Sequence, residues 1–286
     1  MAASTAALRG ITKQYKDFTL GPVDMTVPAG SIVGLIGENG AGKTTLLKIL
    51  CGVNRADSGT VDLLGGSPAD AATRAKIGVV FEDAFFYGSF TAAQVARSLA
   101  GMYGARWNAD SFSAYLRRFG LDAGKKLKEY SRGMRLKLSL AAALAHDPEL
   151  LVLDEATAGL DPVVRGELLD LFLEFIQDER HSIVMSSHIT ADLEQIADSI
   201  AYLHNGQLLF QENKDDLLQE YGVLHCGEDV LTSLPAGLVV FTRRGAYGCE
   251  SLVRERRTVQ ELLPEAVCDA ARLDDIMRFY SGRDAQ

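Results

Sequence analysis

The glycine-rich run GENGAGKTT at residues 37–45 constrains the fold of this chain more than any other segment. The apolar run SIVGLIG at 31–37 precedes it, and KTTLLKIL at 43–50 follows with apolar residues at helical spacing. The local order is therefore a buried strand, a glycine-rich loop and a helix. This order predicts a helix N-terminus beside a loop that can turn its backbone N–H groups toward an anion.

The spacing within this loop fits the pattern G-x-x-x-x-G-K-[ST]. Its glycines let the backbone curl, so that consecutive N–H groups point at phosphate oxygens. Lys43 is placed to reach the β- and γ-phosphates, and the Thr44 hydroxyl is placed to ligate Mg²⁺. The loop predicts a site for a nucleoside triphosphate, formed by Gly37, Glu38, Asn39, Gly40, Ala41, Gly42, Lys43, Thr44 and Thr45.

A second apolar strand, LLVLDE at 150–155, ends in two carboxylates. Burying an unpaired acid is costly, so an aspartate that ends such a strand usually lies at the carboxyl edge of the sheet, where ligands bind. Asp154 suits the coordination shell of Mg²⁺, and Glu155 can polarise an attacking water. Without the phosphate loop, the same pair would indicate only an exposed strand end.

The rest of the chain alternates short apolar strands with helices. Such alternation implies a mainly parallel sheet covered on both faces, hence an α/β fold. Residues 222–286 differ: LVVFTRR and ESLVRER, separated by GAYG, predict a hairpin. Thr258 and Glu261 predict a capping box, and LDDIMRFY predicts a final short helix. This tail is expected to be a small α+β extension.

Four motifs in order carry a family resemblance: GENGAGKTT, YSRGMRLKL (130–138), LLVLDEATAGLDP (150–162) and SSH (186–188). Together they resemble the ATP-binding subunit of an ABC transporter, from about residue 6 to 215. The resemblance implies a P-loop NTPase cassette over 1–221, with a RecA-like core sheet, an antiparallel β subdomain and a helical subdomain at about 84–146. The tail at 222–286 resembles those of bacterial ABC-2-type exporters, and we expect it to support a dimer.

The resemblance also implies roles for individual residues. Tyr15 resembles the aromatic residue that stacks on adenine. Ser131 and Gly133 match the signature loop that touches the γ-phosphate of ATP bound to the opposite subunit. Asp161 resembles the loop that couples the two sites of a dimer, and His188 resembles the switch histidine that reaches the γ-phosphate and the catalytic glutamate.

The sequence departs from the family at two places. The usual signature SGGQ is SRGM here, which introduces Arg132 and Met134 while keeping the serine and the second glycine. Glu82 stands where the family often has a glutamine that contacts Mg²⁺ or the attacking water. We expect Glu82 to join Thr44 and Asp154 in the metal site, where its charge would strengthen the dependence of closure on Mg²⁺. An unchanged Mg²⁺ dependence of ATP hydrolysis in Glu82→Gln would refute this hypothesis.

The family works as pairs of subunits, so the resemblance implies a homodimer, or a heterodimer with a close relative, docked on an ABC-2-type transmembrane subunit. The aromatic cluster Phe85-Phe86-Tyr87 is expected to line the docking groove, and the alternative is an ordinary core cluster in the helical subdomain. The overall motif details look most like the ATPase subunits that export phenol-soluble modulins in Gram-positive bacteria, which implies export of amphipathic cytolytic peptides.

Two alternatives remain in view. Closely similar ATPase subunits serve lantibiotic or bacitracin resistance exporters. A more distant alternative is a soluble ABC ATPase that acts on ribosomes or DNA, but those proteins pair two cassettes in one chain or carry a long coiled coil. A regulatory module without turnover would be expected to lack Glu155 or His188, and both are present.

Charge and composition restrict the partners of the chain and its place in the cell. The formal net charge is −9, which argues against a nucleic-acid partner, although residues 84–146 form a basic insert within an acidic chain. The N-terminus lacks the pattern of a signal peptide, and no apolar run approaches a membrane span. The four widely spaced cysteines show no metal-binding pattern and are expected to be reduced. We expect the chain at the cytoplasmic face of the membrane, in contact with lipid only through its partner.

Overall fold

The structure is a computed structural model that describes residues 4–81, 86–235, 237–245 and 248–281. The chain divides into two units, each described by itself. The first consists of Met1–His188 with Ala201–Phe210, and the second of Ile189–Ile200 with Gln211–Gln286.

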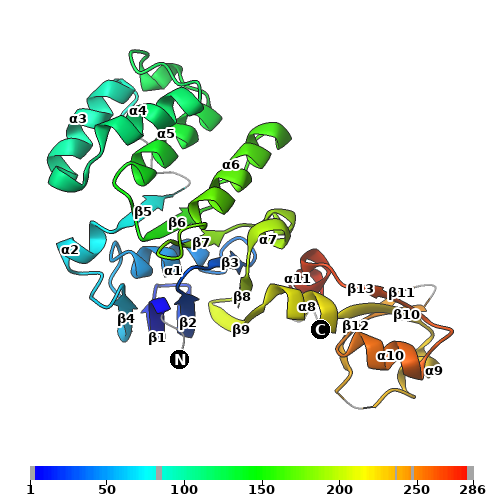
Figure 1. The fold of residues 1–286 in the computed structure, drawn as a ribbon. Helices are drawn as coiled ribbons and strands as arrows, with labels where there is room; N and C mark the ends of the chain where they lie inside the picture. Colours follow the sequence, from blue (N-terminus) through cyan, green and yellow to red (C-terminus); the bar gives the residue numbers. More distant parts are fainter. Residues whose placement is uncertain (1–3, 82–85, 236, 246–247, 282–286) are drawn as a thin grey trace. The chain divides into compact units, whose positions relative to one another are not determined.

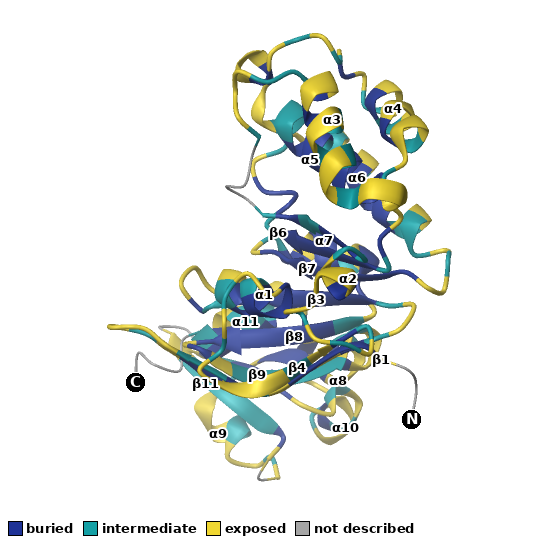
Figure 2. Cartoon of the chain, turned by 90° about the vertical axis from the view of Figure 1, so that its left-hand side faces the viewer, coloured by how far each residue is buried: buried dark blue, intermediate teal, exposed yellow. Residues whose placement is uncertain are grey.

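A six-stranded sheet carries the glycine-rich loop, in the strand order β5-β6-β7-β3-β8-β9 (Figure 1). β5 runs parallel to β6, β6 to β7, and β7 to β3. Every residue of β3, β6 and β7 is buried, as their continuous apolar sequences require for strands covered on both faces (Figure 2). The strands are β3 (Ile32–Ile36), β5 (Ile77–Val80), β6 (Leu150–Asp154), β7 (Ser182–Ser186), β8 (Ser199–His204) and β9 (Gln207–Asn213).

A separate antiparallel sheet has the order β2-β1-β4. Its inward side chains share one apolar core with the large sheet and with the helix that follows the glycine-rich loop; Leu8, Val23, Leu35 and Leu46 are all fully buried in this core. The strand before the glycine-rich loop and the helix after it are therefore both anchored in this core. The elements are β1 (Ser4–Gln14), β2 (Thr19–Pro28), β4 (Ser58–Leu63), α1 (Lys43–Leu50) and the short α2 (Ala71–Arg74).

The segment between β5 and β6 is helical and has its own core. Phe112, Leu127 and Leu138 are buried in it, and α3, α4 and α5 pack on one another (Figure 1). Each buried leucine or phenylalanine in such a core contributes roughly 1.5–3 kcal/mol. The elements are α3 (Ala92–Tyr103), the 3₁₀ turn η1 (Gly104–Arg106), α4 (Ala109–Arg118), the 3₁₀ turn η2 (Leu127–Glu129) and α5 (Arg132–Leu144), with α6 (Pro162–Phe175) following β6.

The second unit contains a four-stranded antiparallel sheet in the order β11-β12-β10-β13. One face of this sheet packs on a small apolar core that includes Leu224, Val253 and Val259. The elements are α7 (Thr190–Ile196), α8 (Lys214–Glu220), β10 (Gly222–Cys226), α9 (Glu228–Leu231), β11 (Val239–Gly245), β12 (Gly248–Val253), α10 (Arg256–Leu262), β13 (Val267–Ala270) and α11 (Leu273–Ser281).

The expected α/β fold class is confirmed, including the antiparallel sheet, the helical segment and the hairpin formed by β11 and β12. The capping box at Thr258 is wrong, because α10 begins at Arg256 and Thr258 lies inside the helix. There the Thr258 hydroxyl donates to Glu255. None of the helices formed by the described residues is long and apolar enough to cross a lipid bilayer.

The two compact units do not coincide with the modules expected at 1–221 and 222–286. The second unit begins at Gln211 and also takes Ile189–Ile200 from within the expected cassette. Glu194 of α7 explains this, since its carboxylate accepts from the backbone N–H of Leu273 at 2.8 Å, and its carbonyl accepts from Lys214 Nζ at 2.9 Å. The expected domain limits remain a prediction about the folded modules.

Candidate functional site

The glycine-rich loop wraps around the side chain of Lys43. Lys43 is the first residue of α1, and its Nζ donates to the carbonyl oxygens of Gly37 at 2.8 Å and Glu38 at 3.2 Å. Gly42 precedes the helix at φ 106°, a conformation that favours glycine. A Cβ at Gly37 would lie 2.2 Å from the carbonyl oxygen of Leu203, so only glycine fits there. The loop therefore places the buried Lys43 ammonium beside the N-terminus of α1, the end of a helix that attracts anions.

Asp154 connects the loop with two strands. Its Oδ2 accepts from the Thr44 hydroxyl at 2.8 Å, and its Oδ1 accepts from the Ser186 hydroxyl at 2.6 Å. Asp154 is 2% exposed, and these two hydroxyls offset part of the cost of burying its charge. Asp154 ends β6 and Ser186 ends β7, so the parallel register of the two strands brings them together.

Glu155 lies between a cation and an imidazole. Its Oε2 is 2.6 Å from His188 Nδ1 and accepts from the His188 backbone N–H at 3.2 Å. Its Oε1 lies 3.5 Å from Lys43 Nζ, an ion pair without hydrogen-bond geometry, so among the described residues this buried oxygen has no hydrogen-bond partner. The backbone of Glu155 is left-handed, with φ 52°, and its N–H donates to the Ser186 hydroxyl at 3.1 Å. The carboxylate is fixed in place and retains one acceptor oxygen.

A cavity of about 450 Å³ opens beside these groups. An aromatic pair lies at its rim: the rings of Tyr15 and Phe18 are 6.5 Å apart, and Asn54 Nδ2 donates to the Tyr15 hydroxyl at 3.4 Å. The lining residues are Tyr15, Phe18, Glu38, Asn39, Gly40, Gly42, Lys43, Thr44, Thr45, Lys48, Asn54 and Glu155. Most of the residues expected from the sequence are therefore gathered at one place.

Four residues of this region were not anticipated. Phe18, Lys48 and Asn54 line the cavity, and Ser186 bonds Asp154. Ser186 is the first residue of the SSH motif, so its position after a buried strand could have indicated it. Asn54 and Phe18 lie in turns that carry no comparable sequence signal. Two expected loop residues, Gly37 and Ala41, are not among the described residues that line the cavity; Ala41 is buried, and its carbonyl accepts from the Gly206 N–H at 3.1 Å.

The donor groups fit a nucleoside triphosphate with Mg²⁺. The hydroxyl of Thr44 and the carboxylate of Asp154 are oxygen ligands of the kind that Mg²⁺ prefers. Within the described ranges, no three His, Cys, Asp or Glu side chains form a metal-binding group. A metal at Thr44 and Asp154 would take phosphate oxygens and water among its other ligands, as Mg²⁺ commonly does in such sites.

Ser131 of the signature loop and Asp161 of the coupling loop each cap a helix within this chain. The Ser131 hydroxyl accepts from the N–H of Met134 at 3.2 Å and caps α5, while Asp161 Oδ1 accepts from Val163 and Val164 at 3.1 and 3.0 Å and caps α6. A Cβ at Gly133 would lie 3.4 Å from the Leu160 side chain. None of Ser131, Gly133 and Asp161 is among the described residues that line the cavity.

Two residues with expected roles lie in the gap between the described ranges 4–81 and 86–235. Glu82 and Phe85 lie outside the described residues, so their roles stay predictions. Tyr87 is 78% exposed, and its ring lies 5.8 Å from that of Phe90, while Phe86 packs against the helical core.

Comparison with known proteins agrees with this geometry. Residues 20–158 match the family model described as ABC transporter. An uncharacterized ABC transporter ATP-binding protein of Synechocystis is 38% identical over 70% of this chain, and the match spans 58% of that relative's length. The bacitracin transport ATP-binding protein of Enterococcus faecalis is 35% identical, over 72% of this chain and 68% of its own.

Two further matches extend the comparison. The lantibiotic transport ATP-binding protein of Streptococcus pyogenes is 33% identical, over 73% of this chain and 90% of its own. A solved ATP-binding subunit of an ABC transporter is 28% identical and superposes with a TM-score of 0.68, over 75% of this chain and 92% of its own. The chain therefore belongs to the family of ABC transporter ATP-binding proteins, and its matched region is an ATPase cassette.

Proposed function

We propose that the chain hydrolyses ATP as the nucleotide-binding subunit of an ABC-2-type membrane exporter for antimicrobial peptides. The observation that carries the hydrolytic part is the position of Glu155, bonded to His188 at 2.6 Å and lying 3.5 Å from Lys43. Glu155 and Lys43 line the same cavity as the phosphate loop, and His188 contacts Glu155. A purely regulatory nucleotide site has no need of a carboxylate held in this way.

The loop residues bind and orient the phosphates. Lys43 Nζ donates two hydrogen bonds to the carbonyl oxygens of Gly37 and Glu38, and an ammonium has a third proton to donate to a phosphate oxygen. Mg²⁺ bound at Thr44 and Asp154 would neutralise charge on the phosphates. The Ser186 hydroxyl keeps the Asp154 carboxylate oriented toward Thr44. The adenine base would stack on Tyr15, which is 42% exposed.

Glu155 and His188 handle the attacking water. The buried Oε1 of Glu155 lacks a hydrogen bond among the described residues and so can accept a proton from a water placed in the cavity. His188 Nδ1 and the His188 N–H hold the other oxygen, which fixes the direction of the free one. The His188 ring is half exposed, so its Nε2 is free to approach the terminal phosphate.

The proposal includes a second copy of the chain, or a close relative, as partner. Ser131 and Gly133 start α5 away from the cavity lining, where their hydroxyl and N–H groups can serve a nucleotide on a facing subunit. Asp161 caps the neighbouring helix α6. On this proposal ATP bound between two subunits favours the closed pair, and hydrolysis favours separation.

The names of two relatives support the class of peptide proposed for export. Proteins 35% and 33% identical to this chain are named for bacitracin transport and lantibiotic transport. These names support antimicrobial peptides in preference to phenol-soluble modulins, which remain a prediction from motif detail. On this proposal the chain binds the cytoplasmic face of a transmembrane subunit, and the exposed Tyr87 belongs to the docking surface.

The test uses the chain co-purified with its membrane subunit in proteoliposomes. We expect ATP hydrolysis that requires Mg²⁺ and that bacitracin or a lantibiotic stimulates about twofold or more, a modest change in barrier height. Stimulation by a phenol-soluble modulin alone would favour the other peptide class. Hydrolysis that no peptide alters would remove the peptide assignment while leaving the ATPase assignment intact.

A further inference from the structure

The second unit contains a cavity that ATP binding and hydrolysis do not use. It has a volume of about 510 Å³ and lies at one end of the four-stranded sheet. Strands β10, β11 and β12 supply its lining residues, namely His225, Cys226, Arg243, Arg244, Gly245, Gly248, Cys249 and Glu250. Two thiols and two guanidinium groups therefore share one cavity.

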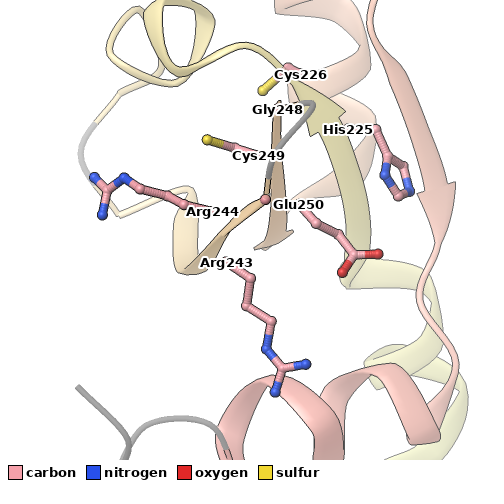
Figure 3. A pocket seen from close by; sticks show the side chains of 8 residues that line it. His225, Cys226, Arg243, Arg244, Gly248, Cys249 and Glu250 are labelled. Atoms are coloured by element: carbon pink, nitrogen blue, oxygen red, sulfur yellow. The ribbon is translucent and has the colours of Figure 1, made fainter.

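The two thiols lie directly opposite each other. Cys226 on β10 pairs with Cys249 on β12 as the last pair of the antiparallel ladder. Because side chains alternate along a strand, both thiols project from the same face of the sheet, while His225 and Glu250 project from the other (Figure 3). Opposed Cβ atoms in such a pair are about 4.5–5.5 Å apart, and a disulfide needs about 3.5–4.5 Å. A small approach of the two strands is enough to join them.

The backbone around the pair can supply that approach. Gly227 follows Cys226, and Gly248 precedes Cys249. The ladder between β10 and β12 ends at this pair, and beyond it the described part of β12 pairs only with β11, through Gly245 and Gly248. Glycine accepts a wide range of backbone angles, and Gly248 already lies at φ 140°. Cys249 is 7% exposed and Cys226 is half-buried, so a reagent reaches Cys226 first.

A cation lies next to the thiols. Arg244 is the direct cross-strand neighbour of Cys249 on β11, so Arg244, Cys249 and Cys226 form one row across three strands. Its Nε is bonded to Glu228 at 2.8 Å, yet the side chain remains 69% exposed. An exposed guanidinium that lines the cavity can bind a carboxylate of an incoming molecule.

We propose that Cys226 and Cys249 are a reversible oxidation site that exchanges with small anionic disulfides such as glutathione disulfide. The thiolate of Cys226 attacks one sulfur of the reagent and displaces one small thiolate, which leaves a mixed disulfide on Cys226. The thiolate of Cys249 then attacks Cys226 Sγ and displaces the second small thiolate. Two protein thiols are oxidised, one reagent disulfide is reduced, and the two protons released go to the departing thiolates.

The remaining cysteine of this unit provides an internal contrast. Cys268 on β13 lies opposite Leu224 rather than a cysteine. It is 7% exposed and belongs to the apolar core. An exchange governed by geometry must therefore spare Cys268, whereas an indiscriminate oxidation would not.

The test treats the intact chain with glutathione disulfide and maps disulfides by mass spectrometry of non-reduced digests. We expect one linkage, Cys226 to Cys249, that dithiothreitol reverses and that Cys268→Ser leaves intact. We expect Cys249→Ser to stop at a glutathione adduct on Cys226. The wild-type experiment alone decides the matter if a variant fails to fold. No linkage, or comparable linkage to Cys268, would overturn the proposal.

A second experiment tests the part played by Arg244. Arg244→Gln should slow linkage by glutathione disulfide about two- to fivefold, the range expected for losing one exposed charge contact. It should leave linkage by the neutral 2-hydroxyethyl disulfide unchanged. Equal effects on both reagents would show that Arg244 does not recognise the anion, and would overturn the assignment of an anionic reagent.

Discussion

His188 Nδ1 lies 2.6 Å from Oε2 of Glu155, and the His188 backbone N–H binds the same oxygen at 3.2 Å. The histidine thus holds one carboxylate oxygen by two contacts, while the other oxygen faces Lys43. This arrangement gives His188 a structural reason to affect hydrolysis before any contact with phosphate is considered. It also separates the orientation of Glu155 from its charge, so the two can be tested independently.

Replacing His188 tests that orientation. We expect His188→Ala to lower kcat about ten- to a hundredfold, because Glu155 would lose the side-chain contact that directs it. The KM for ATP should change little, since the phosphate loop is untouched. His188→Asn should recover part of the rate, because its amide can donate to Glu155. Steady-state kinetics of both variants test this, with His225→Ala as a matched histidine control. A raised KM for ATP with an unchanged kcat would contradict the prediction.

Removing the Ser186 hydroxyl tests the support of the metal site. In Ser186→Ala the Asp154 carboxylate loses the donor that lies 2.6 Å from Oδ1. Loss of a partner that orients a metal ligand typically costs 10- to 100-fold in metal affinity. We therefore expect about a tenfold higher Mg²⁺ concentration for half-maximal ATP hydrolysis. Ser98→Ala on the exposed face of α3 is the control, and an identical Mg²⁺ titration for both variants would be the adverse result.

Ser131 combines a cap with a proposed contact to the partner's nucleotide. Ser131→Ala should cost about 1 kcal/mol of stability, because α5 loses its cap. Ser131→Asp restores the cap but places a negative charge where a phosphate is expected. We expect urea unfolding of Ser131→Asp to match the wild type while its ATP hydrolysis falls about tenfold or more. Wild-type turnover in Ser131→Asp would leave Ser131 as a cap alone.

The thiol pair should respond to pH. Burial raises the pKa of the Cys226 thiol above its ordinary value, and Cys249 and Asp229 raise it further. The charged groups beside the thiols are Asp229 and Glu228 on α9 and Arg244 on β11, and Glu228 and Arg244 are paired with each other. The cavity is also lined by His225, Arg243 and Glu250, which neighbour these residues along their strands and so project from the opposite face of the sheet. Since the thiolate is the nucleophile, its fraction grows about tenfold for each pH unit below the pKa.

The rate of linkage by glutathione disulfide should therefore rise from about pH 7 to about pH 9. Asp229→Asn removes a negative charge that opposes ionisation, so it should move the whole profile to lower pH. Release of glutathione, followed over this range, gives the profile. A rate that does not depend on pH would contradict attack by the Cys226 thiolate.

The sequence predicts the site best where chemistry and secondary structure coincide. Asp154 and Glu155 follow a buried apolar strand, and Lys43 follows a glycine-rich loop, so the carboxyl edge of a parallel sheet brings them together. Asn54 and Phe18 reach the same cavity from turns. Their positions depend on how the antiparallel sheet packs on α1, which no local pattern encodes.

Local patterns also misplace the start of one helix and miss long-range contacts. A serine, threonine or aspartate followed by glutamate suggests a capping box, but α10 starts earlier because Glu255 adopts a left-handed conformation at φ 50°. The second unit takes α7 from the middle of the expected cassette through contacts of Glu194 with α8 and α11. These hydrogen bonds join residues that are far apart in the sequence. The composition of each segment therefore does not predict that they belong to one unit.

The most direct test of hydrolysis at this site is the turnover of Glu155→Gln. Glutamine keeps the shape of the side chain and removes the carboxylate that would accept the proton of water. With Mg²⁺ and ATP, we expect kcat to fall about 10²- to 10⁴-fold, while the Kd for ATP changes less than about tenfold. The exposed Glu179→Gln should hydrolyse ATP like the wild type. A wild-type rate in Glu155→Gln would contradict the assignment of Glu155 as the base.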